Sequence, residues 1–341
     1  MKIAIVGKNG LLGGALLRYA VLSGLSEGQE ILPLDLPDFD VTSRMFTLDT
    51  FRDFQPNVII NTSGINLIDW LEKKPNTART VHVQGTANLR ETAKRYDALL
   101  VQISCAEVLG QTPQHIIKDE SSKISCEDGR FLYSDAIHEN QSGSKTNTVS
   151  ANISSEVWLP LTEDCVPKPL SVYAKTKLDS ERAAREAPRH LIVRTGTLFG
   201  KPGVNSSGNL VETLLNAFRR QEKMSVVCDL WTSYVWVEHL AEAVFTMIRQ
   251  ECTGLYHVAN TAAASPFDVA QELVRLTGVR RDFQPISAAD YNFTAPRAVW
   301  SVLDTLKYQT LPNMPQLPPW QQALDSYLAS RNPFELKEKT A

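Results

Sequence analysis

Short apolar runs rich in β-branched residues alternate with segments whose apolar positions recur every three or four residues. The runs have the length and continuity of strands buried on both faces, and the segments have the period of amphipathic helices. Predicted strands and helices follow one another at residues 2–6, 11–22, 31–34, 57–61, 75–96, 98–104, 171–186 and 190–194. Because parallel neighbours need crossover connections, this order predicts an α/β fold with a doubly wound, parallel Rossmann-type sheet.

The pattern weakens in two places. Between about residues 111 and 169, serine-rich turn chemistry replaces periodicity. This predicts a long insertion that is a lid, an arm toward a partner subunit or an irregular loop. Beyond Gly200 the elements are less regular. We therefore expect a first domain at 1–199, which carries the insertion, and a smaller lobe at 200–341 with some segments returning to the main sheet.

The first strand leads directly into a glycine-rich turn. Gly7, Gly10 and Gly13 separate the strand from the helix that begins at Leu11. The pyrophosphate of a dinucleotide needs backbone N–H donors and the positive end of a helix, with no Cβ in the way. Asp35 closes the next apolar run about 20 residues on, where an acceptor for a ribose hydroxyl is expected. The sequence favours a dinucleotide site here over a tight turn of some other α/β protein.

Composition narrows the classes of partner. The 341-residue chain has a formal net charge of −3, so it lacks the basic surface that nucleic acids or anionic membranes select. No apolar run approaches the roughly 20 residues of a membrane span, and Lys8 and Asn9 interrupt the amino-terminal run, unlike a signal peptide. The five cysteines are scattered without paired metal-ligand spacing, which predicts free thiols, no metal site and a cytoplasmic location. They are Cys105, Cys126, Cys165, Cys228 and Cys252.

A second constellation is Tyr173-Ala-Lys-Thr-Lys177 on a predicted helix. Residues four apart share a helix face, so the phenol and the ammonium point the same way. A cation beside the phenol, with the charge of an oxidised nicotinamide, is expected to lower the tyrosine pKa from about 10 toward the working range. The pair could then pass a proton to or from a carbonyl.

These motifs together resemble the extended short-chain dehydrogenase/reductase family, over nearly the whole chain. Within that family the likeness is closest to dTDP-4-dehydrorhamnose reductases. The family likeness rests on Gly7–Gly13, Asp40-Val41, the exit of the third strand, Tyr173–Lys177 and Arg194-Thr195. The likeness to the reductases rests on Gly7–Gly13, Asn61–Asp69 with Glu72, and Arg297–Asp304 with Lys307.

The resemblance implies an NAD(P)-dependent enzyme that reduces a 4-keto sugar nucleotide. It implies Tyr173 as proton donor, Lys177 as its electrostatic support and Cys105 at the position that holds the carbonyl. The implied substrate contacts are Glu107, Thr197 and Arg297. The implied cofactor contacts are Gly7, Asn9, Gly10, Leu11, Leu12, Gly13, Asp35, Asp40, Val41, Asn61, Thr62, Ser63, Gly64, Tyr173 and Lys177.

The chain departs from the family pattern at several of these positions. Cys105 replaces a serine or threonine, and a thiol is a weak hydrogen-bond donor; Ser104 beside it should face the opposite way, because strand residues alternate. His82 stands where the long helix usually carries asparagine. Ala106-Glu107 replaces Asp-Tyr, and Thr197 replaces a tryptophan. Asp35 favours NAD, because a carboxylate repels a 2′-phosphate, but the choice between NAD and NADP stays open.

The sequence leaves three hypotheses for the function. The leading one is the sugar-nucleotide reductase. A sugar-nucleotide epimerase of the same fold is the second; dehydration is disfavoured because Ala106 cannot deliver a proton. The third is a non-catalytic, dinucleotide-binding regulatory subunit resembling that of methionine adenosyltransferase. A homodimer is left open, and the particular sugar is not disclosed by the sequence.

Overall fold

The computed structural model describes residues 1–24, 28–110, 159–204, 208–220, 223–279 and 283–331, together with the backbone of two short strands. Two compact units are defined: residues Met1–Thr112 with Pro160–Ala341, and residues Pro113–Leu159. In the second unit, β5 (Ile124–Glu127) and β6 (Arg130–Tyr133) pair as an antiparallel hairpin. The rest of the predicted insertion up to residue 158 lies outside the described residues.

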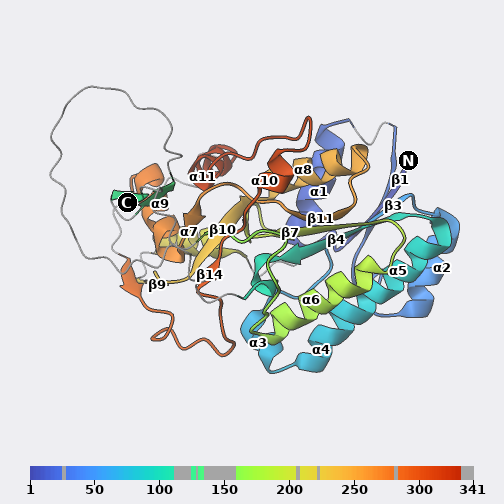
Figure 1. Ribbon diagram of the computed structural model, residues 1–341, viewed down its shortest axis with the longest axis horizontal. Coiled ribbons are helices and arrows are strands. Elements are labelled where there is room, and N and C mark those ends of the chain that lie inside the picture. The colour runs from blue at the N-terminus through green and yellow to red at the C-terminus, as the bar shows by residue number, and fades with distance from the viewer. Residues whose placement is uncertain are drawn as a thin grey trace. The chain divides into compact units, whose positions relative to one another are not determined.

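A six-stranded parallel sheet forms the centre of the first unit (Figure 1). Its order is β11-β7-β4-β3-β1-β2, and every neighbouring pair runs parallel. The order reverses between β1 and β3, which is where ligands bind in doubly wound sheets, at the carboxyl ends of the strands. The predicted α/β, Rossmann-type fold is confirmed. The strands are β1 (Lys2–Val6), β2 (Glu30–Leu34), β3 (Val58–Asn61), β4 (Leu99–Cys105), β7 (His190–Thr195) and β11 (Gly254–His257).

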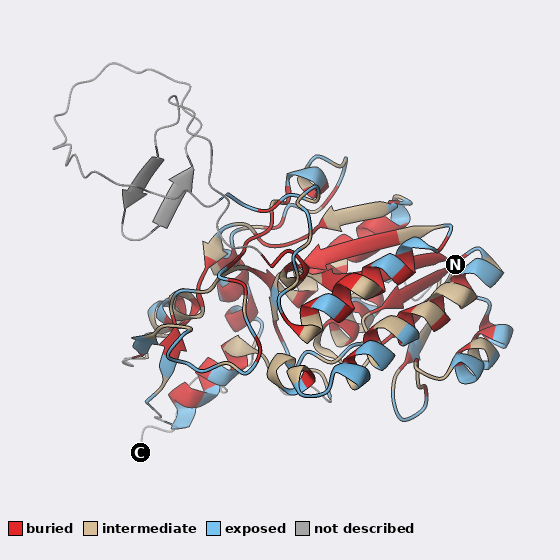
Figure 2. Ribbon diagram, turned by 60° about the horizontal axis from the view of Figure 1, so that its bottom comes forward, coloured by how far each residue is buried: buried red, intermediate tan, exposed pale blue. Residues whose placement is uncertain are grey.

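Helices cover both faces of this sheet. On one face α1 (Leu11–Leu22) packs against α8 (Val237–Arg249), and on the other α2 (Arg44–Phe54), α5 (Gly85–Tyr96) and α6 (Val172–Arg185) lie side by side (Figure 1). The central strands are buried along nearly their whole length and mostly apolar, as expected of strands covered on both faces. Figure 2 shows these strands buried and the outward faces of the helices exposed.

The segment from Pro75 to Tyr96, predicted as one helix, contains an irregular turn. It consists of α4 (Pro75–Arg79), a π-helical turn at Thr80–Gln84, and α5. A π turn inserts one extra residue into the helical repeat and is frequent at functional sites. The short helix α3 (Ile68–Glu72) precedes it.

The carboxyl-terminal part builds a second hydrophobic core, which includes Phe199, Tyr234, Trp320 and Tyr327. The division into domains at about residue 199 stays a prediction, although β11 does return to the main sheet. The strands here are β8 (Thr197–Phe199), β9 (Ser225–Val227), β10 (Trp231–Trp236), β12 (Ala263–Ala264), β13 (Gln284–Ile286) and β14 (Trp300–Ser301). The helices are α7 (Leu210–Arg220), α9 (Pro266–Thr277), α10 (Leu306–Gln309) and α11 (Trp320–Ala329).

Candidate active site

The glycine-rich turn joins β1 to α1 at the point where the strand order reverses. Gly7 has φ +93°, a conformation that side chains rarely adopt, and a Cβ there would lie 2.6 Å from Thr62 Oγ1. A Cβ at Gly13 would lie 2.0 Å from the carbonyl oxygen of Gly7. Gly10 is the N-cap of α1 and makes no side-chain capping bond. The turn therefore presents bare backbone at the positive end of a helix, as an anionic group requires. Leu11 and Leu12 form the first turn of that helix.

Asp35 fixes this turn to the end of β2. Its carboxylate accepts hydrogen bonds from the backbone N–H groups of Asn9 and Leu36, both at 2.8 Å. Each carboxylate oxygen has a further lone-pair site, so Asp35 can still accept from a ribose hydroxyl. Lys8 lies nearby, with its Nζ 4.0 Å from a carboxylate oxygen of Asp38. Both a carboxylate and a cation thus border the predicted ribose position.

The loop after β3 forms the next wall. Thr62 Oγ1 donates to the carbonyl of Val6 at 2.7 Å, which ties this loop to β1. Asn61 is buried, and its amide donates to Gln102 Oε1 at 2.8 Å while its oxygen accepts from Ser63. Its side chain therefore shapes the loop from inside.

Two further predicted cofactor residues also serve the backbone around the site. Asp40 accepts from the backbone and the hydroxyl of Thr42 at 2.9 and 2.7 Å. The carbonyl of Val41 accepts from Asn88 Nδ2 at 2.8 Å. Like Asn61, these residues contribute to the form of the site through internal bonds.

Helix α6 carries Tyr173 and Lys177. Ser171 caps the helix by accepting from the N–H of Ala174 at 3.1 Å, and Glu72 of α3 accepts from the N–H of Val172 at 2.8 Å. The Lys177 ammonium is buried and donates to the carbonyl of Ile103 on β4 at 2.6 Å. The helix is thus held at its first turn and at the lysine.

Tyr173 lies against Cys105, and each of the two side chains affects the pKa of the other. Burial, with further contributions from Cys105 and Glu107, raises the pKa of Tyr173 well above its ordinary value of 10. Burial dominates the pKa of Tyr173 in the protein alone, and the lowering expected from Lys177 together with an oxidised nicotinamide stays a prediction. Burial lowers the pKa of Lys177, and Cys105 and Glu181 oppose that change. At neutral pH the phenol holds its proton and can donate it.

Cys105 remains a neutral thiol at neutral pH, because burial raises its pKa to about 11. Ser104 does not replace it, since its hydroxyl donates to Glu181 Oε1 at 2.6 Å on the interior side. This agrees with the alternation of side chains along β4.

Glu107 and Arg297 meet at the same place. Burial raises the pKa of Glu107, while the Arg297 guanidinium and the N–H of Ala298 oppose that rise. Arg297 also pairs with Asp69 of α3 at 3.1 Å and lies over the ring of Phe293, 4.6 Å from its centroid. The structure therefore brings Tyr173, Lys177, Cys105, Glu107 and Arg297 into one cluster. Thr197 is exposed on β8.

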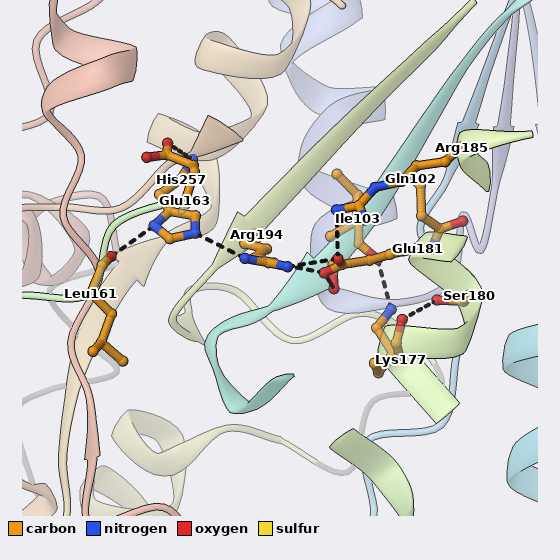
Figure 3. Close-up of polar contacts among 11 residues, drawn as sticks. Gln102, Ile103, Leu161, Glu163, Lys177, Ser180, Glu181, Arg185, Arg194 and His257 are labelled. Atoms are coloured by element: carbon orange, nitrogen blue, oxygen red, sulfur yellow. Dashed lines mark hydrogen bonds and ion pairs between the residues drawn. The ribbon is translucent and has the colours of Figure 1, made fainter. Parts of the chain in front are cut away.

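A buried polar network lies behind this cluster (Figure 3). Glu181, one helical turn beyond Lys177, accepts two bonds from Arg194 at 2.8 and 2.9 Å. A guanidinium nitrogen of Arg194, Nη1, lies 3.5 Å from His257 Nε2, and His257 Nδ1 lies 3.0 Å from the carbonyl oxygen of Leu161. Glu163 accepts from the N–H of His257 at 2.7 Å. This network joins β7, β11 and the segment around Leu161 to α6.

Sequence reasoning gave no role to Glu72, Asp69 or Glu181. The spacing of four between Lys177 and Glu181 was an available signal, since such residues share a helix face. Asp69 and Arg297 are too far apart in sequence for any local pattern to pair them.

Metal-ligating clusters and membrane-spanning helices are both absent from the described part of the chain. Within the described residues, no group of three or more His, Cys, Asp or Glu side chains is placed to hold a metal ion. Among the helices of the same residues, none is long and apolar enough to cross a membrane. Four of the cysteines, Cys105, Cys165, Cys228 and Cys252, are free thiols.

A glycine-rich turn at the reversal of a parallel sheet, with a tyrosine and lysine four apart beside it, defines a Rossmann-type protein of the extended short-chain dehydrogenase/reductase class. The model of the RmlD substrate binding domain family matches residues 1–123 and 156–332. The chain therefore belongs to that family.

Individual relatives agree with this assignment. The dTDP-4-dehydrorhamnose reductase of Aggregatibacter actinomycetemcomitans is 24% identical over 96% of this chain and 98% of its own length. The crystal structure of the Bacillus anthracis reductase of the same name, in complex with NADP, has a TM-score of 0.78 at 23% identity and covers 97% of this chain and 99% of its own. The Clostridium acetobutylicum counterpart has a TM-score of 0.77 at 25% identity, with coverage of 96% and 99%.

Proposed function

We propose that this protein is an NAD(P)-dependent oxidoreductase that reduces the 4-keto group of a sugar nucleotide, the reaction that the name dTDP-4-dehydrorhamnose reductase gives to its relatives. The observation that carries the proposal is the position of Tyr173 on α6, against Cys105 at the carboxyl end of β4 and one helical turn from the buried Lys177. A proton donor of this kind suits a carbonyl reduction.

The chain's own residues fit a dinucleotide. A side chain at Gly7 or Gly13 would collide with backbone or with Thr62, so these two glycines allow the tight turn and the close packing of α1, and Gly10 is the glycine that would let phosphate approach the backbone. We propose Gly10 and the first turn of α1 for the pyrophosphate and Asp35 for the ribose. The residues Asn9, Leu11, Leu12, Asp40, Val41, Asn61, Thr62, Ser63 and Gly64 would form the surrounding walls. When bound, the nicotinamide supplies the hydride for the carbonyl carbon.

Tyr173 would give its proton to the oxygen of that carbonyl, which completes the alcohol. The neighbouring Lys177 ammonium would then stabilise the phenolate that is left. Cys105 would hold the carbonyl oxygen more weakly than a hydroxyl, since a thiol is a poor donor. Arg297, Glu107 and the exposed Thr197 would bind the sugar nucleotide, with Arg297 supplying positive charge for its phosphates.

Cofactor choice follows from the groups around the ribose position. We propose that the protein accepts both dinucleotides and prefers NADH. Asp35 would repel a 2′-phosphate, whereas Lys8, 4.0 Å from Asp38, offers that phosphate a cation. Free thiols among the described cysteines support a reducing, cytoplasmic location, and a homodimer remains part of the proposal to be tested by solution mass measurement.

The direct test follows NADH or NADPH absorbance with a panel of 4-keto sugar nucleotides. We expect Tyr173→Phe to abolish turnover while leaving dinucleotide affinity nearly unchanged, because the phenol oxygen moves the proton and does not cradle the pyrophosphate. Tyr96→Phe, at the end of α5, is the matched control and should retain full activity. Dinucleotide binding without turnover of any sugar would instead favour the regulatory subunit, and full activity of Tyr173→Phe would remove the phenol from the mechanism.

A further inference from the structure

His82 lies in the π-helical turn between α4 and α5, and both of its ring nitrogens are engaged. The side chain is buried, with 2% of its surface exposed. Nε2 lies 3.1 Å from the backbone nitrogen of Ile65, and Nδ1 lies 2.9 Å from Thr176 Oγ1. The first contact is with the loop after β3, and the second is with the helix that carries Tyr173.

The contact with Ile65 fixes the tautomer of the ring. A backbone N–H can only donate, so Nε2 must be an acceptor and the proton of the neutral ring must be on Nδ1. Nδ1 therefore donates to Thr176, whose single hydroxyl proton is shared between the carbonyls of Val172 and Tyr173, both at 3.0 Å. Burial, with the Lys177 charge, lowers the His82 pKa to about 3, so this neutral form persists at working pH.

The imidazole also contacts both sides of the site through its ring. A Cβ at Gly64 would lie 3.4 Å from Cδ2 and from Nε2 of His82, so the loop backbone lies close over the ring. On the other side, the His82 and Tyr173 rings meet edge to face with centroids 5.7 Å apart. The same loop reaches the glycine-rich turn at its beginning, where Thr62 bonds to Val6.

We propose that His82 is a positioning residue that ties the cofactor side of the site to the catalytic helix: Nε2 sets the Gly64–Ile65 loop, and Nδ1 sets the first turns of α6 under Tyr173. The inference rests on the proposed function, because the two halves that it joins are the proposed dinucleotide wall and the proposed proton donor.

Three substitutions separate the two contacts. In His82→Gln, the amide oxygen can take the position of Nε2 and accept from Ile65. In His82→Asn, the shorter amide can take the position of Nδ1 and donate to Thr176. His82→Leu fills similar volume and makes neither bond. Loss of one bond from a buried group corresponds to a change of about tenfold.

We expect His82→Asn to weaken NADH binding about tenfold with kcat nearly unchanged, and His82→Gln to lower kcat about tenfold with NADH binding nearly unchanged. His82→Leu should show both losses. His190→Leu is the control, because His190 likewise has its Nδ1 in a hydrogen bond, to the backbone carbonyl of Ala187 at 3.0 Å, but lies at the amino-terminal end of β7, away from the site. It should change thermal stability without either loss.

Hydrogen exchange at the Ile65 amide tests the inference apart from the proposed function. Protection should persist in the wild type and His82→Gln and fall in His82→Asn and His82→Leu. If the Ile65 amide shows this pattern of protection but the protein binds no dinucleotide, the proposed function is wrong, and the hydrogen bond between His82 and Ile65 is still supported. If exchange does not distinguish the variants, or if all three lose affinity and kcat equally, His82 is only a packing residue and the inference is wrong.

Discussion

His257 should make the fold sensitive to acid. Its ring is fully buried, Nδ1 faces the carbonyl of Leu161 at 3.0 Å, and Nε2 faces the Arg194 guanidinium at 3.5 Å. Burial and the charge of Arg194 lower the pKa of His257 from 6.5 to about 3, although the carbonyl of Leu161 opposes this change. A proton on Nε2 would stand against a guanidinium that is itself committed to Glu181, so the folded protein excludes it.

The sign and size of the effect follow from linkage. Below pH 6.5 the unfolded chain takes up a proton that the folded chain refuses until about pH 3, so stability is lost as pH falls through this window. Each pH unit within it costs about 1.4 kcal/mol. At pH 4 the loss relative to neutral pH is about 3 kcal/mol for this one residue, a large part of a typical unfolding free energy of about 5–15 kcal/mol.

The variant His257→Asn isolates this contribution, because its amide can still donate to Leu161 but cannot titrate. Urea unfolding at pH 7 and pH 4 should show a less stable variant at pH 7 and a gap that narrows by about 3 kcal/mol at pH 4. His82 has a similarly lowered pKa, but it is present in both proteins, so its contribution cancels in the difference between their free energies of unfolding. Leu161→Ala is the control, since it removes packing without removing a titrating group. It should lower the free energy of unfolding by the same amount at pH 7 and at pH 4. A gap between wild type and His257→Asn that is the same at pH 7 and pH 4 would show that His257 does not make the fold sensitive to acid.

Two further predictions concern the active site. Cys105→Ser should retain the rate of reduction or raise it by up to about tenfold, because a hydroxyl is a stronger hydrogen-bond donor than a thiol. The NADH absorbance assay measures this rate. A lower rate would show that this position does not hold the substrate. Lys8→Ala should weaken NADPH binding by about fivefold with little change for NADH, and Asp38→Asn should strengthen NADPH binding, as expected of exposed charges worth about 1 kcal/mol. Titration at two salt concentrations checks this pair, and equal effects on both dinucleotides would contradict it.

The central sheet could be predicted from the sequence because its strands are covered on both faces. Such strands read as continuous apolar runs, and the runs at residues 2–6, 57–61 and 98–104 lie within a residue of β1, β3 and β4 at either end. The π turn at Thr80–Gln84 could not be predicted in this way. An extra residue shifts the helical phase, but the five residues Thr80–Gln84 are too few to show that shift in the apolar pattern.

The site was predictable in composition more than in arrangement. Helical spacing places Tyr173 and Lys177 on one face of α6, and strand alternation separates Ser104 from Cys105. The direction of the Lys177 ammonium depends on Ile103, a residue of another element, and the raised pKa of Tyr173 depends on burial that only the assembled fold creates. The pairing of Asp69 with Arg297 is likewise a product of tertiary structure.

Helix α6 connects these observations, because it is held at four successive levels by groups from other elements. Glu72 binds its first N–H, His82 binds Thr176, the carbonyl of Ile103 binds Lys177, and Ser104 with Arg194 binds Glu181. Three of these four contacts involve a buried charge or a buried histidine, each of which would be costly to leave unpaired. Sliding or rotating the helix would break several of them together. The position of the Tyr173 phenol is therefore set by the whole length of the helix, and a weak donor at Cys105 can be tolerated because the carbonyl does not have to be aligned by that contact alone.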